Sequence, residues 1–292
     1  MEIDNLGIFS KVKNLSLVTS RLVEGLFSGN YRSVFKGPGL EFDEVREYVD
    51  GDDARNIDWN VSSRMGNPYS KTFKEEREIA LFLIVDCSAS LQMGSGDKNK
   101  RQVSSLVAAL LAFAAVHNND MVGAAFFTDK IEKWVAPKKG QKHVTRLIFD
   151  MMNIRPTGNG SDLGLAIRTV YETIKRRGIC IILSDFRTSP AWRELTLLSK
   201  KHDVIAINIS DSMDYSFPKA GFAEIVDPEN SATLFSYGVS GNFRQKYRDF
   251  WDTYRIYWNR EYRKRGINML TIDTDENPVD KLLAYFKRRR RR

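Results

Sequence analysis

Three stretches of the sequence carry acidic and hydroxyl side chains close to the ends of expected strands or helices. Carboxylate and hydroxyl oxygens are hard ligands of the kind that Mg²⁺ binds, and Mg²⁺ usually keeps several waters instead of an all-protein cage. Two carboxylates that lie close together repel each other unless a cation lies between them. If the fold gathers the three stretches, their chemistry predicts a cation site. The stretches contribute Asp86, Ser88 and Ser90, then Thr157, Ser161 and Asp162, and finally Ser184 and Asp185.

Two apolar runs precede the first and the last of these stretches and predict how they meet. Ile79–Val85 is apolar throughout, which is typical of a strand in the middle of a parallel sheet that is covered on both faces. Ile179–Leu183 has the same character. In a doubly wound sheet, ligands bind at the carboxyl ends of the strands, beside the point where the chain switches direction. We therefore expect Asp86 and Asp185 to share one crevice.

Strand and helix patterns alternate along the chain from Ile79 onward. Strands that alternate with helices of this length predict an α/β fold with a doubly wound, mostly parallel sheet. Met121–Phe127 and Ile131–Ala136 are close enough in sequence to form a hairpin, so one edge of the sheet is expected to be antiparallel. Further strands are expected over 204–209 and 269–272, and helices over 102–116, 142–152, 161–177, 191–201, 243–265 and 279–286.

Shifts in composition divide the chain into three parts. Residues 1–76 are expected to form an N-terminal segment: apolar residues at near-helical spacing predict a short amphipathic helix over 1–20. Residues 21–76 are rich in glycine, arginine and acidic residues and contain two turn clusters, which predicts a small β-rich segment. Residues 77–286 form the expected α/β domain, with a hairpin insertion near 211–240. Residues 287–292 are all basic and form an expected basic tail.

The composition of the 292 residues, 42% hydrophobic and 28% charged, is ordinary for a globular protein. The net charge is +8, but the last six residues supply six of those charges, so nucleic-acid binding is not favoured. The tail allows a peripheral contact with acidic lipid head groups. No signal-peptide pattern is visible, and no apolar run reaches the roughly 20 residues that cross a bilayer. With Cys87 and Cys180 expected as buried free thiols, we predict a cytoplasmic protein.

The oxygen-bearing stretches resemble a known domain. Asp86-Cys87-Ser88-Ala89-Ser90, together with the loop at 160–163 and the strand end at 183–185, is similar to the von Willebrand factor A domain. The metal-ion-dependent adhesion site (MIDAS) of that domain uses Asp-x-Ser-x-Ser, a loop Thr and a later Asp. Ser161 stands where the loop Thr is usual, and it keeps the hydroxyl but lacks the stiffening methyl. The resemblance implies metal ligation by Asp86, Ser88, Ser90, Ser161 and Asp185, with Thr157 as the alternative loop ligand.

A second resemblance lies upstream. The string 51–59, GDDARNIDW, and shorter strings around it resemble the bacterial family called domain of unknown function 58, in which they precede a von Willebrand factor A-like domain. Together the two matches cover roughly residues 30–210. Members of that family commonly accompany MoxR-type AAA+ ATPases, and many carry membrane helices. The resemblance therefore implies a MoxR-type ATPase as the protein partner, and Mg²⁺ (or Mn²⁺ or Ca²⁺) as the bound ion.

The same upstream string also has a structural interpretation. Asp52 or Asp53 is expected to cap a short helical turn. Arg55 and Asp58 are one helical turn apart and are expected to pair. Trp59 is expected to anchor the segment on the sheet domain. This interpretation assigns the string a scaffold role instead of a catalytic one.

Common signatures of catalysis are missing from the sequence. It contains no Gly-x-Ser-x-Gly elbow and no phosphate-binding Gly-x-x-x-x-Gly-Lys-[Ser/Thr] loop. We predict that the protein has no catalytic residues and is not an enzyme, but a scaffold in which Mg²⁺ docks a partner's carboxylate during assembly or maturation of other proteins. Two alternatives stay open: a phosphoester hydrolase whose metal activates water, and a nucleic-acid or membrane-surface binder acting through residues 243–292.

Overall fold

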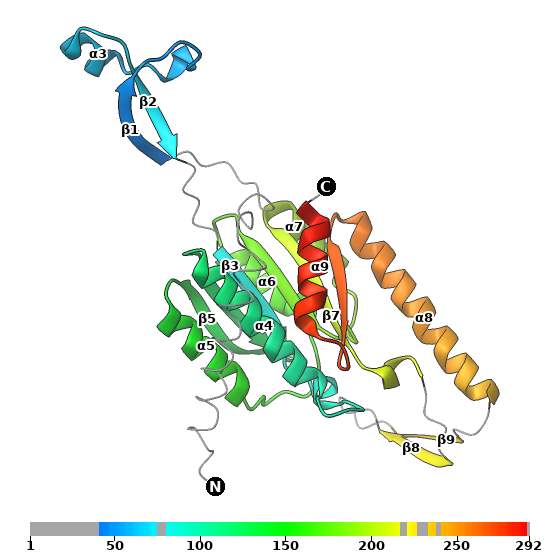
Figure 1. Ribbon diagram of the computed structural model, residues 1–292. Coiled ribbons are helices and arrows are strands. Elements are labelled where there is room, and N and C mark those ends of the chain that lie inside the picture. Colours follow the sequence, from blue (N-terminus) through cyan, green and yellow to red (C-terminus); the bar gives the residue numbers. More distant parts are fainter. Residues whose placement is uncertain (1–40, 75–79, 217–220, 227–232, 238–240, 291–292) are drawn as a thin grey trace. The chain divides into compact units, whose positions relative to one another are not determined.

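The computed structural model describes residues 41–74, 80–216, 221–226, 233–237 and 241–290 (Figure 1). Its contacts divide the chain into two units, and the smaller one is Lys36–Glu78. Residues 1–40 of the predicted N-terminal segment lie outside the described residues, as do the last two arginines of the predicted tail. Among the described residues, none of the helices is both long and apolar enough to cross a membrane.

The small unit is a two-stranded antiparallel sheet with a short helix between its strands. β1 (Glu41–Glu47) pairs with β2 (Tyr69–Lys74). α3 (Trp59–Met65) begins after Asp58, whose carboxylate accepts hydrogen bonds from two backbone N–H groups in the first turn. This cap satisfies donors that have no partner inside the helix, which is why the helix begins here.

Charged residues of the upstream string take partly different partners from those predicted. Asp53 caps the short 3-10 turn that follows it, as expected. The predicted pair between Arg55 and Asp58 is wrong: Lys71 Nζ lies 3.1 Å from Asp58 Oδ2, whereas Arg55 Nε lies 3.8 Å from an oxygen of Asp53. The reason is that Asp58 is held by its capping bonds, beside the neighbouring strand that carries Lys71. The hydrogen bond from Lys71 lowers the pKa of Asp58.

The larger unit contains a six-stranded sheet in the order β10-β7-β6-β3-β4-β5 (Figure 1). Neighbouring strands are parallel except β4 and β5, which form an antiparallel edge. The predicted doubly wound, mostly parallel sheet and its antiparallel edge are confirmed. The strands are β3 (Ala80–Asp86), β4 (Met121–Phe127), β5 (Ile131–Lys138), β6 (Ile179–Ser184), β7 (Asp203–Ser210) and β10 (Asn268–Asp273).

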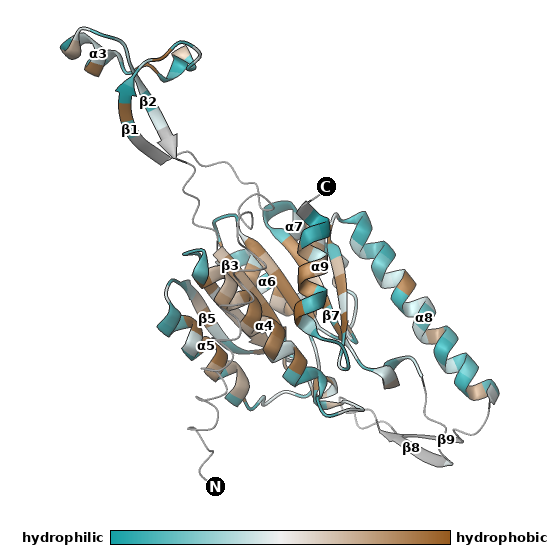
Figure 2. Cartoon of the chain, in the orientation of Figure 1, coloured by the Kyte–Doolittle hydropathy of each residue, from teal (hydrophilic) through white to brown (hydrophobic). Residues whose placement is uncertain are grey.

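Helices cover both faces of this sheet, and β3 shows why its sequence is apolar throughout. Leu81, Leu83 and Val85 pack in one core with α4, α5 and α9, whereas Phe82 and Ile84 pack in a second core with α6, α7 and α8. Successive side chains of a strand point to opposite faces, so a strand buried on both faces needs apolar residues at every position. Figure 2 shows apolar residues along the central strands and α4, and a largely polar α8. The helices are α4 (Lys100–His117), α5 (Gln141–Asn153), α6 (Leu163–Thr173), α7 (Trp192–Lys201), α8 (Gly241–Lys264) and α9 (Pro278–Arg290).

Two helices differ most in length from the prediction. α6 begins at Leu163 and not at Ser161, because Asp162 is its cap and accepts a hydrogen bond from Leu165 N–H. It ends at Thr173 instead of the predicted residue 177. α9 continues through Arg290 instead of ending at residue 286, and Arg289 makes an ion pair with Asp203 at the start of β7. Part of the predicted basic tail is therefore helical and held by the sheet domain.

Two smaller expectations concern the insertion and the cysteines. β8 (Phe222–Val226) and β9 (Thr233–Tyr237) form an antiparallel hairpin within the region expected to hold one. Cys87 and Cys180 are both free and buried, as expected.

Candidate functional site

The switch in chain direction lies between β3 and β6. From β3 the chain passes through α4 to β4 on one side, and it later returns through α6 to β6 on the other side. β3 and β6 are paired in parallel, with Val85 opposite Leu183. The residues that follow these two, Asp86 and Ser184, therefore lie side by side at the carboxyl edge. The predicted meeting of the two strand ends is confirmed.

The carboxylate of Asp86 is the centre of this cluster and is 1% exposed. Its Oδ2 accepts hydrogen bonds from the hydroxyls of Ser184 at 2.7 Å and Ser161 at 3.0 Å, and its Oδ1 accepts one from Ser88 N–H at 2.9 Å. Burial, followed by the charge of Asp185, raises the pKa of Asp86 to about 6. No ion pair joins Asp86 to any Lys, Arg or His among the described residues. A buried carboxylate of this kind lacks the counter-charge that usually accompanies burial.

The hydroxyls of Ser88 and Ser90 lie next to Asp86 and face each other. Their oxygens are 3.1 Å apart, and both side chains are almost completely buried. Ser88 precedes a short 3-10 turn, yet its side chain makes no capping hydrogen bond. Helix capping, the ordinary structural explanation for serines at such a position, therefore does not account for the hydroxyl of Ser88.

The loop before α6 presents Ser161 to the cluster and turns Thr157 away from it. The hydroxyl of Thr157 donates to Glu132 Oε2 at 3.0 Å, and the N–H groups of Thr157 and Gly158 donate to Oε1 of the same carboxylate. Although burial opposes it, these hydrogen bonds lower the pKa of Glu132. Of the two predicted alternatives, only Ser161 contacts Asp86. Thr157 instead anchors the loop to β5.

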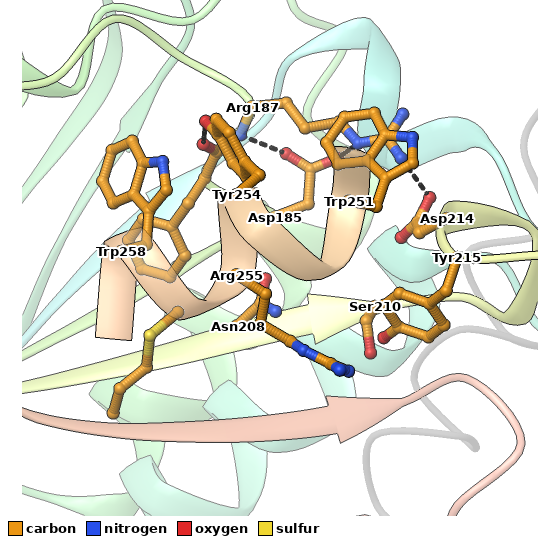
Figure 3. A pocket seen from close by; sticks show the side chains of 12 residues that line it. Asp185, Arg187, Asn208, Ser210, Asp214, Tyr215, Trp251, Tyr254, Arg255 and Trp258 are labelled. Atoms are coloured by element: carbon orange, nitrogen blue, oxygen red, sulfur yellow. Dashed lines mark hydrogen bonds and ion pairs between the residues drawn. The ribbon is translucent and has the colours of Figure 1, made fainter. Parts of the chain in front are cut away.

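Asp185 lies beside this cluster but already has cationic neighbours. Its Oδ2 is 3.1 Å from Nζ of Lys100, and its Oδ1 accepts a hydrogen bond from Arg187 N–H at 3.2 Å. Lys100 also lies 2.9 Å from Asp214, and the guanidinium of Arg187 pairs with the other oxygen of Asp214 at 2.7 Å. Figure 3 shows Asp185, Arg187 and Asp214 in this arrangement.

Sequence reasoning missed Lys100, Arg187 and Asp214. A signal for Lys100 existed, because it is the first residue of the helix that follows β3. In a parallel sheet such helices begin at the carboxyl edge, where Asp86 and Asp185 also lie. Asp214 had no comparable signal, since it follows β7 in a polar, turn-rich stretch.

A pocket adjoins the cluster beneath α8, and Asp185 lines it (Figure 3). We call it the α8 pocket. Its aromatic wall is Trp251, Tyr254 and Trp258, while Asn208 of β7 adds a polar side chain. The hydroxyl of Tyr254 donates to the backbone oxygen of Phe186 at 2.8 Å, which ties the helix to the strand end after β6.

The donor atoms of the cluster are of the type that binds a hard divalent cation. Asp86 supplies a buried carboxylate that makes no ion pair within the described part of the chain, and the serines supply hydroxyl oxygens. Among the described residues, no group of three or more His, Cys, Asp or Glu side chains is arranged to hold a metal ion. An ion here would therefore depend on two carboxylates, on hydroxyls and on water, a composition that suits Mg²⁺ better than a transition metal.

The sequence is similar to a family and to mycobacterial proteins. The family model described as "Protein of unknown function DUF58" matches residues 44–255. The uncharacterized protein Mb1516 of Mycobacterium bovis is 27% identical over 293 residues, which cover 99% of this chain and 92% of the relative. The uncharacterized protein MAV169 of Mycobacterium avium is 29% identical over 137 residues, covering 47% of this chain and 80% of the relative.

The structure is similar to solved structures at low identity. An aerotolerance-related membrane protein from Bacteroides fragilis aligns with a TM-score of 0.47 and 13% identity, covering 73% of this chain and all of that chain. The SpRpn10 VWA domain aligns with a TM-score of 0.40 and 11% identity, covering 72% of this chain and 95% of that chain. The family match spans most of the chain and includes both units described above. The chain therefore belongs to the DUF58 family, and its larger unit has a doubly wound, mostly parallel α/β fold.

Proposed function

We propose that this protein is a metal-dependent protein-binding module and not an enzyme. In this proposal a divalent cation, Mg²⁺ before Mn²⁺ or Ca²⁺, binds at the carboxyl edge of β3 and β6 and takes a carboxylate from a partner protein. The observation that carries the proposal is Asp86, a buried carboxylate that is surrounded by hydroxyls and has no ion-pair partner among the described residues. The proposed ligands are Asp86, Ser88, Ser90, Ser161 and Asp185.

Each of these side chains has a separate task in the proposal. Asp86 supplies the negative charge, while Ser161 and Ser184 orient its Oδ2 through hydrogen bonds. Ser88 and Ser90 offer neutral oxygens, so they would add ligands to the ion without adding negative charge to the two carboxylates. The cation, when bound, supplies a positive charge that attracts one more carboxylate. This arrangement favours docking over catalysis, because docking needs neither a nucleophile nor a general base.

The partner in this proposal presents an acidic residue with an apolar or aromatic neighbour. The α8 pocket adjoins the site through Asp185, and its wall of Trp251, Tyr254 and Trp258 suits such a neighbouring side chain. The family resemblance suggests a MoxR-type AAA+ ATPase as the partner and assembly or maturation of other proteins as the process.

The test is co-purification with a MoxR-type ATPase of the same organism, with Mg²⁺ and with EDTA. Asp86→Ala should abolish capture, and so should EDTA acting on the wild type. Asp97→Asn is the matched control, because Asp97 is an exposed carboxylate in the loop between β3 and α4. Capture that survives both EDTA and Asp86→Ala would contradict the proposal.

A parallel assay distinguishes docking from hydrolysis. The wild type and Asp86→Ala are incubated with p-nitrophenyl phosphate and Mg²⁺, and release of nitrophenol is measured. The proposal expects no turnover above background from either protein. Turnover by the wild type that depends on Mg²⁺ and on Asp86 would instead establish the hydrolase alternative.

A further inference from the structure

Lys100 is a fully buried lysine at the edge of the proposed cation site. Its side chain is 1% exposed, and its Nζ lies 3.1 Å from Asp185 and 2.9 Å from Asp214. An ammonium group that is taken out of water needs carboxylates or other acceptors around it. The ammonium of Lys100 therefore supplies the positive charge that Asp185 and Asp214 need in this buried place.

The charges around Lys100 are arranged unevenly. Asp185 and Asp214 share two cationic side chains, Lys100 and Arg187. Asp86, the neighbouring carboxylate, has no ion pair with any of the described residues. Without a metal ion, the negative charge of Asp86 is therefore not balanced by a cation of the described residues. The negative charge of Asp185 is balanced by Lys100.

We propose that Lys100 competes with the divalent cation for Asp185. An ion that bound Asp86 and Asp185 together would share the carboxylate of Asp185 with the ammonium of Lys100, and the two positive charges would repel each other. Lys100 has to release Asp185 when the ion enters. This inference rests on the proposed function, since it concerns the same site.

Asp214 makes this release possible without leaving a buried ammonium alone. Its Oδ2 stays within reach of Lys100, and its Oδ1 is held by Arg187 at 2.7 Å. Asp214 is further fixed by the N–H of Asp211, which donates to Oδ2 at 2.9 Å. Lys100 can therefore move from two carboxylates to one and remain paired.

Competition has two consequences. The metal-free protein keeps Asp185 and Asp214 neutralised and stays folded without the ion. The ion pair between Lys100 and Asp185 also weakens the binding of a divalent cation. Removal of the charge of Lys100 should therefore increase the affinity for that cation. A structural salt bridge that did not compete would predict the opposite, because its loss would disturb Asp185 and weaken the site.

The experiment measures Mn²⁺ binding by electron paramagnetic resonance, using the full-length wild type and the variants Lys100→Met and Lys100→Gln. Both variants are expected to bind Mn²⁺ at least tenfold more tightly than the wild type. Lys98→Met is the matched control, since Lys98 is an exposed lysine two residues away, and its affinity should equal that of the wild type. Lys100→Gln keeps an amide donor for Asp185 and covers the case in which Lys100→Met does not fold.

Thermal unfolding provides a second readout. In EDTA, Lys100→Met should unfold at a lower temperature than the wild type, and Mn²⁺ should raise its midpoint more than it raises that of the wild type. Equal or weaker Mn²⁺ binding by the Lys100 variants overturns the inference. If the Lys100 variants bind Mn²⁺ more tightly but capture of the ATPase does not depend on metal, the competition between Lys100 and the cation is supported. The proposed docking function is then contradicted.

Discussion

Asp86→Asn is expected to stabilise the metal-free protein at neutral pH. Burial and the charge of Asp185 raise the pKa of Asp86 to about 6, so its ionised form is disfavoured in the folded state. Asparagine has nearly the same shape and keeps an oxygen that can accept the hydrogen bond from Ser88 N–H. Its amide group can donate to the hydroxyl oxygens of Ser161 and Ser184, which now donate to Asp86.

The magnitude and the pH range follow from the direction of this pKa shift. Because the folded state binds the proton of Asp86 more tightly than the unfolded state does, the stability it contributes is complete below pH 3.8 and is lost as the pH rises through 6. A tenfold change in proton affinity corresponds to about 1.4 kcal/mol. The difference between 3.8 and about 6 therefore makes the ionised wild type roughly 3 kcal/mol less stable than the protonated form.

Urea unfolding in EDTA, followed by circular dichroism from pH 4 to pH 8, measures this effect. The advantage of Asp86→Asn in the free energy of unfolding should be close to zero at pH 4 and should grow to roughly 3 kcal/mol at pH 8. Asp97→Asn removes an exposed carboxylate from the same edge of the sheet and should give no such trend. If Asp86→Asn lowers stability by a constant amount at every pH, the reasoning about a destabilised carboxylate is refuted.

Four further substitutions test the surroundings of the site. Ser161→Ala should weaken Mn²⁺ binding by about tenfold, whereas Thr157→Ala should leave it nearly unchanged, because only the hydroxyl of Ser161 contacts Asp86; equal effects would contradict the assignment. Glu132→Gln should lower the free energy of unfolding by about 1–2 kcal/mol in urea, since one amide oxygen replaces a charged acceptor of several hydrogen bonds; an unchanged midpoint would argue against it. Trp258→Ala should cost about 3–5 kcal/mol, because the 2% exposed indole packs in the core under α8; a loss below about 1 kcal/mol would show that the core closes around the gap.

Much of the site could be predicted because two strands determine its position. The apolar runs before Asp86 and Asp185 predict strands that are buried on both faces of the sheet. When two such strands pair in parallel, their carboxyl ends lie side by side. Ser161 was one of two loop hydroxyls that the sequence left open. The structure separates them through Glu132, whose side chain holds Thr157 at β5. That contact links residues 25 apart and is not visible in local patterns.

The features that sequence reasoning missed depend on contacts between distant segments. The helix start places Lys100 at the carboxyl edge of the sheet, but its burial depends on two carboxylates, one of them 85 residues away. The basic run at the end of the sequence predicts a tail that includes Arg289, yet Arg289 pairs with Asp203. The contact of Trp59 with the sheet domain would join the two units and stays a prediction.

The most direct test of the central claim is the equilibrium binding of Mn²⁺ to the wild type and to Asp86→Asn, measured by electron paramagnetic resonance at pH 8. The wild type should bind one ion per chain, and Asp86→Asn should lose that binding, because the ion loses the one carboxylate in the cluster that has no ion pair among the described residues. Binding of the same stoichiometry and affinity by both proteins would contradict the account.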